Sequence, residues 1–108
     1  MENRKEFDKL VDMLDYKDDM YILIEDMDLS AKSYNYLMRN NIIDVMGVLE
    51  HLIANNDGIL KKVRKEIVRK IYGNKDKEVI AYLDKLIAIN KIEYYEKQIK
   101  ILKLKYGI

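Results

Sequence analysis

The chain has 108 residues, a formal net charge of +1, only four glycines, and neither proline nor cysteine. This length suits one compact domain with a modest core, and the shortage of helix-breaking residues favours helix. The lack of cysteine excludes disulfides and thiolate metal sites, and no apolar stretch approaches the ~20 residues that span a membrane, so we expect a soluble cytoplasmic protein without a signal peptide.

Charge is distributed unevenly along the chain. Residues 1–58 carry 6 Lys/Arg and 13 Asp/Glu, a net charge of −7, whereas residues 59–108 carry 14 and 6, a net charge of +8. A basic half of this kind attracts polyanions such as nucleic acids. It would equally attract the acidic half of the same chain or of a second copy. Charge alone leaves these three interpretations open.

An amphipathic helix is predicted near the N-terminus, because apolar residues recur there at i, i+3, i+4 and i+7. Residues 16–20 are then expected to form a turn. Residues 21–28, first apolar and then acidic, should be an ordered connection on the core, with up to one helical turn. The stripe of the first helix consists of Phe7, Leu10, Val11 and Leu14.

The next predicted helix has a clear start and end. Ser30 suits an N-cap, because its hydroxyl can accept hydrogen bonds from free amides of the first turn. The helix should run to Arg39 and end at Asn40 and Asn41, since asparagine tolerates the left-handed conformation of a helix end. Its expected anchors on the core are Leu29, Leu37, Met38 and Ile42.

A short helix from Asp44 to about Ile53 follows, and then a basic one. The turn signal Asn-Asn-Asp-Gly at residues 55–58 separates them, and Asn56 or Asp57 is expected to cap the second helix. That helix should begin at Ile59 and end before Gly73. The core positions of the two helices are predicted to be Val45, Met46, Val48, Leu49 and Leu52, and then Ile59, Leu60, Val63, Ile67, Val68 and Ile71. The other face of the basic helix carries Lys61, Lys62, Arg64, Lys65, Arg69 and Lys70.

The last predicted helix is the longest and runs from Asn74 or Asp76 to Tyr106. Its second part shows a heptad pattern about two heptads long. Its first part follows another register, so the helix either bends near Asn90 or packs on two different neighbours. The residues of the heptad pattern are Ile92, Tyr95, Ile99, Leu102 and Tyr106, and those of the other register are Ile80, Leu83 and Ile87. The whole pattern predicts an all-α fold of five or six helices without a sheet.

No pattern in the chain indicates catalysis or a bound metal. The one histidine, His51, lies among apolar residues of a helix, as a surface or edge residue would. The carboxylates at residues 18–19 and 25–28 lack the spacing of a calcium loop. We therefore expect no enzyme and no cofactor. The basic helix can grip phosphates with side chains and N-terminal amides, or it can be a solvated face that neutralises the acidic half.

Residues 24–50, IEDMDLSAKSYNYLMRNNIIDVMGVLE, resemble the C-terminal domain of the α subunit of bacterial RNA polymerase. That family shows the pattern I-E-[DE]-L-[DE]-L-S-x-R-[ST]-x-N-x-L-[KR]-x-x-x-I, followed by a short V-x-x-L helix. The matching residues are Ile24, Glu25, Asp26, Asp28, Leu29, Ser30, Ser33, Asn35, Leu37 and Ile42 or Ile43.

The resemblance implies a compact bundle of short helices with two helix-hairpin-helix units over residues 21–73. Residues 1–20 would precede it as an amphipathic helix. Residues 74–108 would follow as a long C-terminal helix that packs on the domain or serves self-association.

The resemblance also implies a function, because the family binds the minor groove of A/T-rich DNA and contacts transcription activators and the σ factor. By position, Lys32 stands where the family has its groove-inserting arginine. Amides at the start of the same helix would hold a phosphate. One alignment of the second hairpin uses Gly58 as the hairpin residue, and another keeps the lysine pair; both stay open. The DNA-binding set is Lys32, Asn35, Tyr36, Gly58, Lys61, Lys62 and Lys65.

The sequence leaves two candidate functions. The first is a small DNA-binding, transcription-associated protein that performs no catalysis. The alternative is a protein–protein interaction module, an adaptor or inhibitor of RNA polymerase or another partner, that keeps the fold without binding DNA. Tyrosine is enriched at interfaces, so its abundance in the last helix is compatible with a homodimer formed there and equally with tyrosines that seal this helix onto the domain. The tyrosines are Tyr82, Tyr94, Tyr95 and Tyr106.

Overall fold

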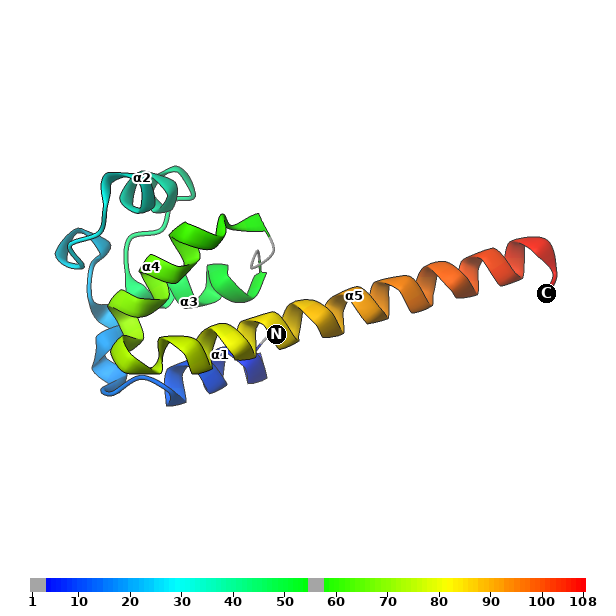
Figure 1. Cartoon of the computed structure of the whole chain (residues 1–108), viewed down its shortest axis with the longest axis horizontal. Coiled ribbons are helices and arrows are strands. Elements are labelled where there is room, and N and C mark those ends of the chain that lie inside the picture. Colours follow the sequence, from blue (N-terminus) through cyan, green and yellow to red (C-terminus); the bar gives the residue numbers. More distant parts are fainter. Residues whose placement is uncertain (1–3, 55–57) are drawn as a thin grey trace.

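The computed structural model describes residues 4–54 and 58–108 and has the predicted all-α fold (Figure 1). The described residues form no β-strand beyond one isolated bridge between Leu23 and Asp44. The α-helices are α1 (Arg4–Asp12), α2 (Ala31–Arg39), α3 (Val45–Ala54), α4 (Lys61–Tyr72) and α5 (Asp76–Tyr106), and the short 3₁₀ helices are η1 (Lys17–Tyr21), η2 (Ile24–Asp26) and η4 (Gly73–Lys75).

A compact body carries one long projecting helix. The body consists of α1 to α4 and the first part of α5, while the rest of α5 extends away from it (Figure 1). The molecule measures 57 × 27 × 24 Å. Since 31 helical residues rise about 46 Å at 1.5 Å per residue, α5 accounts for most of the long dimension.

One core unites the three predicted segments 1–20, 21–73 and 74–108. Side chains with no exposed surface come from α1, α3, α4 and α5. The N-terminal helix and the start of α5 are therefore structural parts of the body. These fully buried residues are Leu10, Leu49, Val68, Val79 and Leu83.

The sequence correctly locates both ends of α2. The Ser30 side chain accepts a hydrogen bond from the Ser33 amide, at 3.3 Å, as an N-cap does. Asn41 adopts a φ of 59°, in the left-handed region, just after the helix. Leu37 is buried, but Met38 is 45% exposed, which overturns its prediction as a core residue. Adjacent helical residues point about 100° apart, and here Leu37 faces the core while Met38 faces solvent.

The basic helix departs from prediction at three places. It begins at Lys61, because Leu60 is extended, with a ψ of 136°. Leu60 is consequently exposed, although it was predicted to be buried. Arg64, predicted to lie on the solvated face, is only 8% exposed and forms a 2.8 Å ion pair with Asp84 of α5. The predicted caps Asn56 and Asp57 lie outside the described residues.

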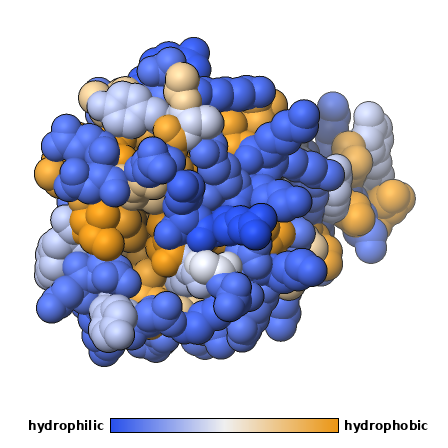
Figure 2. Space-filling view, turned by 60° about the vertical axis from the view of Figure 1, so that its left-hand side comes forward, coloured by the Kyte–Doolittle hydropathy of each residue, from blue (hydrophilic) through white to orange (hydrophobic). Residues whose placement is uncertain are grey.

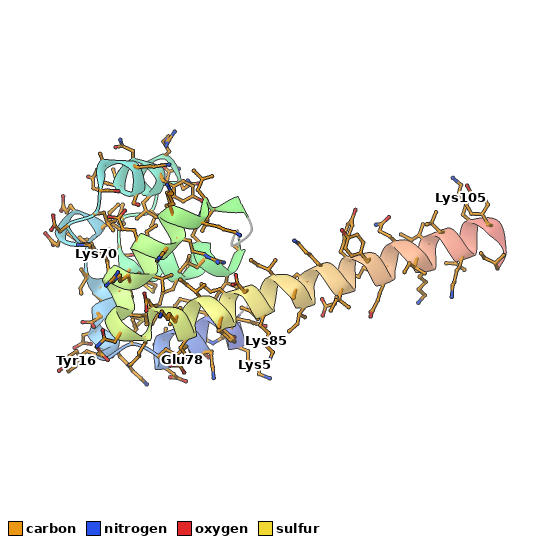
Figure 3. All side chains as sticks on the ribbon, in the orientation of Figure 1. Lys5, Tyr16, Lys70, Glu78, Lys85 and Lys105 are labelled. Carbon is orange, nitrogen blue, oxygen red and sulfur yellow. The ribbon has the colours of Figure 1, made fainter. Side chains whose placement is uncertain are left out.

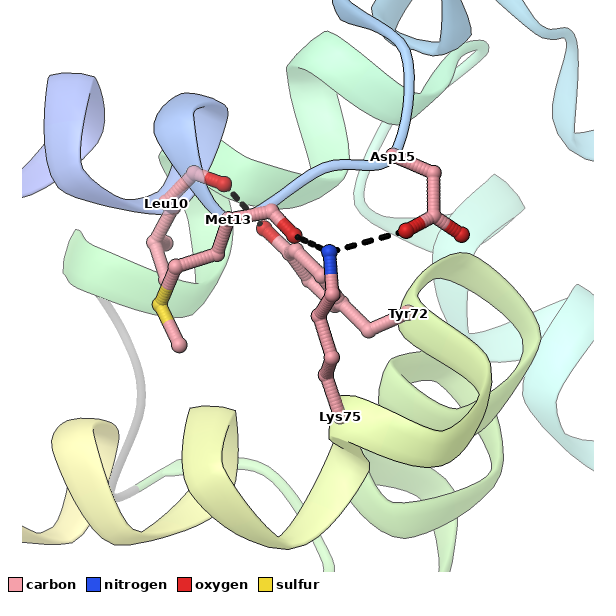
Figure 4. Close-up of polar contacts among 5 residues, drawn as sticks. All are labelled: Leu10, Met13, Asp15, Tyr72 and Lys75. Atoms are coloured by element: carbon pink, nitrogen blue, oxygen red, sulfur yellow. Dashed lines mark hydrogen bonds and ion pairs between the residues drawn. The ribbon is translucent and has the colours of Figure 1, made fainter.

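The junction between α4 and α5 is tied to the end of α1 (Figure 4). The Tyr72 hydroxyl donates to the carbonyl of Leu10 at 2.7 Å, and burial raises the pKa of this tyrosine. The Lys75 ammonium donates to the carbonyl of Met13 at 3.0 Å and pairs with Asp15 at 2.8 Å. The chain reverses direction at this junction. These contacts hold the end of α1 and the residues after it against the end of α4.

We predict that Tyr72→Phe lowers the free energy of unfolding by about 1–3 kcal/mol, because the buried carbonyl of Leu10 loses its donor. Urea unfolding followed by circular dichroism measures the change. Tyr16→Phe, at a side chain that is 74% exposed, serves as the control and should change stability by less than about 0.5 kcal/mol. Equal effects of the two substitutions would contradict the prediction.

Candidate nucleic-acid interface

One carboxylate joins the start of α2 to the middle of α4. Glu66 accepts a hydrogen bond from the Ser30 amide at 2.8 Å and from the Ser30 hydroxyl at 2.6 Å. It also accepts one from the hydroxyl of Ser33, a side chain that is almost fully buried. The Ser30 hydroxyl, followed by that of Ser33, lowers the pKa of Glu66. We call this set of contacts the Glu66 clasp.

The clasp uses the positive end of α2 for a carboxylate of the protein itself. A helix N-terminus carries free amides and a partial positive charge, both of which favour an anion. The Ser30 amide binds Glu66, and the Ser33 amide binds the Ser30 side chain. Two of the amides expected to hold a phosphate are therefore already engaged within the protein.

The clasp also fixes the candidate cations of α2 and α4 relative to each other. Lys32 lies two residues after Ser30, and Lys62 precedes Glu66 by about one helical turn on the same side of α4. The clasp therefore sets the first turn of α2 beside the middle of α4, about one helical turn from Lys62. In the described part of the chain, none of the candidate lysines forms an ion pair. These exposed candidates are Lys32, Asn35, Lys61, Lys62 and Lys65.

Tyr36 faces α3 and is half-buried. Its hydroxyl lies 2.7 Å from Nε2 of His51, and the two rings meet edge to face with centroids 5.6 Å apart. Burial raises the pKa of Tyr36 and lowers that of His51. This pair braces α2 against α3. The sequence analysis missed it, because residues fifteen positions apart on two helices leave no local pattern.

The two alignments of the predicted second hairpin depend on Gly58 and on the lysine pair, which lie in different surroundings. At Gly58, no described atom lies within 4 Å of the position that a Cβ would occupy, and its φ is not among the positive ones. Nothing at this position therefore requires glycine. Lys61 and Lys62, by contrast, are the first two residues of α4, where side-chain cations and free backbone amides coincide. Both alignments stay predictions.

Part of the charge asymmetry is used inside the chain. Lys75 pairs with Asp15 at 2.8 Å, and Lys70 lies 4.0 Å from Asp28, so the basic half contacts the acidic half at two places. The cations at the start of α4 take no part in these ion pairs. The start of the helix therefore remains available to an external anion.

Other kinds of site find no support in the described residues. They contain no cluster of three or more side chains of the types that could hold a metal ion. They also contain no helix that is long and apolar enough to cross a membrane.

No protein-family model, curated protein or solved structure matches this chain. The resemblance to the polymerase domain therefore rests on residues 24–50 of the sequence. The structure adds an arrangement of side chains. Glu66 contacts the start of α2 and follows the lysine pair of α4 by about one helical turn.

We predict that Glu66→Ala lowers the free energy of unfolding by about 1–3 kcal/mol, because the buried hydroxyl of Ser33 loses its partner. Glu66→Gln keeps a hydrogen-bond acceptor and should lower the free energy of unfolding by less. Glu50→Ala, at an exposed glutamate of α3, is the matched control. Chemical unfolding of the three variants measures the differences. Equal stability of Glu66→Ala and Glu50→Ala would show that the Glu66 clasp does not stabilise the fold.

We predict that stability decreases when the pH falls from 7 to 5.5 and that His51→Gln reduces this decrease. Burial lowers the pKa of His51 below the usual 6.5 in the folded chain, so the unfolded chain takes up a proton first. The loss begins near pH 6.5 and ends at the lower, folded pKa. His51 is the only histidine, so urea unfolding across this pH range isolates its effect. Identical pH profiles of the two proteins would refute the prediction.

Proposed function

We propose that this protein is a small DNA-binding, transcription-associated protein that contacts the minor groove and phosphates of A/T-rich duplexes without catalysis. The Glu66 clasp is the observation that carries the proposal, because it holds the start of α2, with Lys32, against α4 about one helical turn from Lys62. The resemblance of residues 24–50 to a groove-binding domain supports the same function.

Each candidate residue has a defined role in this proposal. Lys32 enters the minor groove, where narrow A/T-rich sequences concentrate negative potential. Asn35 bonds a base edge or a sugar. The lysines of α4 and the amides at its start bind phosphates. Tyr36 positions α2 through its contact with His51 and does not itself reach the DNA.

The Glu66 clasp directs where phosphate binds. Its carboxylate sits at the start of α2 and repels a second anion there. A phosphate is consequently directed to the start of α4, where Lys61, Lys62 and Lys65 are exposed. Such a protein would act in the cytoplasm, on the DNA itself or on DNA bound by RNA polymerase.

The test is fluorescence anisotropy of a labelled A/T-rich duplex titrated with the full chain at several salt concentrations. Each neutralised phosphate contributes about −0.9 to the slope of log affinity against log salt. The four candidate lysines therefore predict a slope of about −3 to −4. Lys32→Ala/Lys61→Ala should weaken binding and make that slope shallower by about 2.

The matched control is Lys5→Ala/Lys85→Ala, which removes two exposed lysines from α1 and α5, far from the start of α4 (Figure 3). This variant should retain most of the affinity of the unmodified chain. No binding at low salt, or equal losses in the two double variants, would overturn the DNA-binding proposal.

A second candidate function is a protein–protein interaction module that docks on RNA polymerase or another protein. Apolar side chains are exposed beside the acidic 3₁₀ turns, and Figure 2 shows apolar patches among hydrophilic side chains on that side. Backbone hydrogen bonds from Ile24 to Ile43 and from Val45 to Ile22 bring two chain segments together there. A partner with basic and apolar residues would fit this surface. Its exposed apolar residues are Tyr21, Ile22, Leu23 and Ile43.

A further inference from the structure

The distal part of α5 is exposed, and only its start, at Asn90, Lys91, Tyr94 and Tyr95, lines a pocket with Ile53 and Ala54 of α3 in the described structure. Every residue from Ala88 to the C-terminus is exposed, and Figure 3 shows the side chains pointing into solvent as far as Lys105. Figure 2 shows apolar side chains at the far end of this helix. A helix that stays alone in water is expected to be polar all round. Here large apolar residues recur along its length, which indicates an interaction surface.

One face of this segment has an uninterrupted apolar seam. Its members follow one another at steps of four, three, four, three and four, the spacing of the a and d positions of a coiled coil. No polar residue interrupts it. The opposite face also holds apolar residues, but Asn90 and Lys97 divide them. We define the α5 seam as Ala88, Ile92, Tyr95, Ile99, Leu102 and Tyr106.

Ile92 and Ile99 of the α5 seam point away from the body of the protein, whereas Tyr95 lines a pocket with Ile53 and Ala54 of α3. Val79 and Leu83 are fully buried and mark the side of α5 that packs on the body. Ile92 follows Val79 by about 3.6 helical turns, and Ile99 follows Leu83 by about 4.4 turns. Both seam residues therefore lie on roughly the opposite side of the helix. Two chains can pair along their seams without their bodies colliding.

Charge complementarity indicates which partner fits the α5 seam, a second copy of the same helix, and in which direction that helix runs. In a parallel pair, a g position of one helix lies beside the next e position of the other. With Ile92 at an a position, Lys91 is at g and Glu96 at e, so Lys91 meets Glu96 of the second copy, twice by symmetry. An antiparallel pair with full overlap would instead set Lys91 against Lys105 of the other copy.

We propose that α5 pairs in parallel with α5 of a second copy of this chain through the α5 seam. The bodies of the two chains then lie at the same end of the pair, on its two outer sides. The overlap is only about two heptads long, so the homodimer forms reversibly, with a dissociation constant on the order of micromolar or weaker. This pairing does not require the proposed DNA binding, and the two can be tested separately.

Sedimentation velocity of the full chain from about 5 to 500 µM tests the pairing. The unmodified chain should shift from monomer to dimer as its concentration rises. Ile99→Asp places a charge in the seam and should keep the chain monomeric throughout. Ile101→Asp is the matched control, because Ile101 is exposed to 55%, against 53% for Ile99, and lies outside the seam. That variant should still dimerise, and circular dichroism checks that both variants stay helical.

A chain without cysteine allows the direction to be tested by disulfide formation. Ile92→Cys should give a covalent dimer on mild oxidation. A mixture of Ile92→Cys and Leu102→Cys should give few mixed dimers, because these two positions face each other only in an antiparallel pair. A monomer at every concentration, or equal dissociation by both aspartate variants, would overturn the proposal. Preferential linkage between positions 92 and 102 would overturn the parallel direction. None of these outcomes affects the anisotropy test of DNA binding.

Discussion

The arrangement of the candidate interface depends on one carboxylate in an otherwise basic helix. Glu66 lies in α4 among lysines and arginines, and its partners Ser30 and Ser33 come from the first turn of α2. A carboxylate favours a helix N-terminus both by charge and by hydrogen bonding. This contact fixes where α2 begins in space. The positions of Lys32 and of the Tyr36–His51 pair follow from it.

The same contact explains how the protein can hold its own carboxylate, Glu66, at one helix start and still leave another helix start free for the proposed phosphate contacts. Because hydrogen bonds lower the pKa of Glu66, its carboxylate remains charged at neutral pH and holds the positive end of α2. The start of α4 has no such internal anion among the described residues. Two helix starts of similar type are thereby given different tasks, one structural and one open to an external phosphate. A lysine on α2 can then serve the groove while the lysines of α4 serve the backbone.

Local signals in the sequence predicted local structure well. Ser30 and Asn41 marked the ends of α2, and apolar periodicity located the buried residues of α1 and α3, because these signals act within one or two turns. Contacts between distant segments left no such signal. Arg64 looked like one more solvated cation until α5 placed Asp84 beside it. The clasp was missed for the same reason, because its partners lie 33 and 36 residues apart in the chain.

The change of register within α5 has a physical explanation in the structure. The helix is continuous from Asp76 to Tyr106, so two apolar registers on one helix must face two different directions. The first faces the body, where Val79 and Leu83 are buried. The second begins where the body ends and faces the opposite way. A stripe that merely continued the core would have kept the first direction. The reversal is the pattern that the proposed pairing of α5 with a second copy requires.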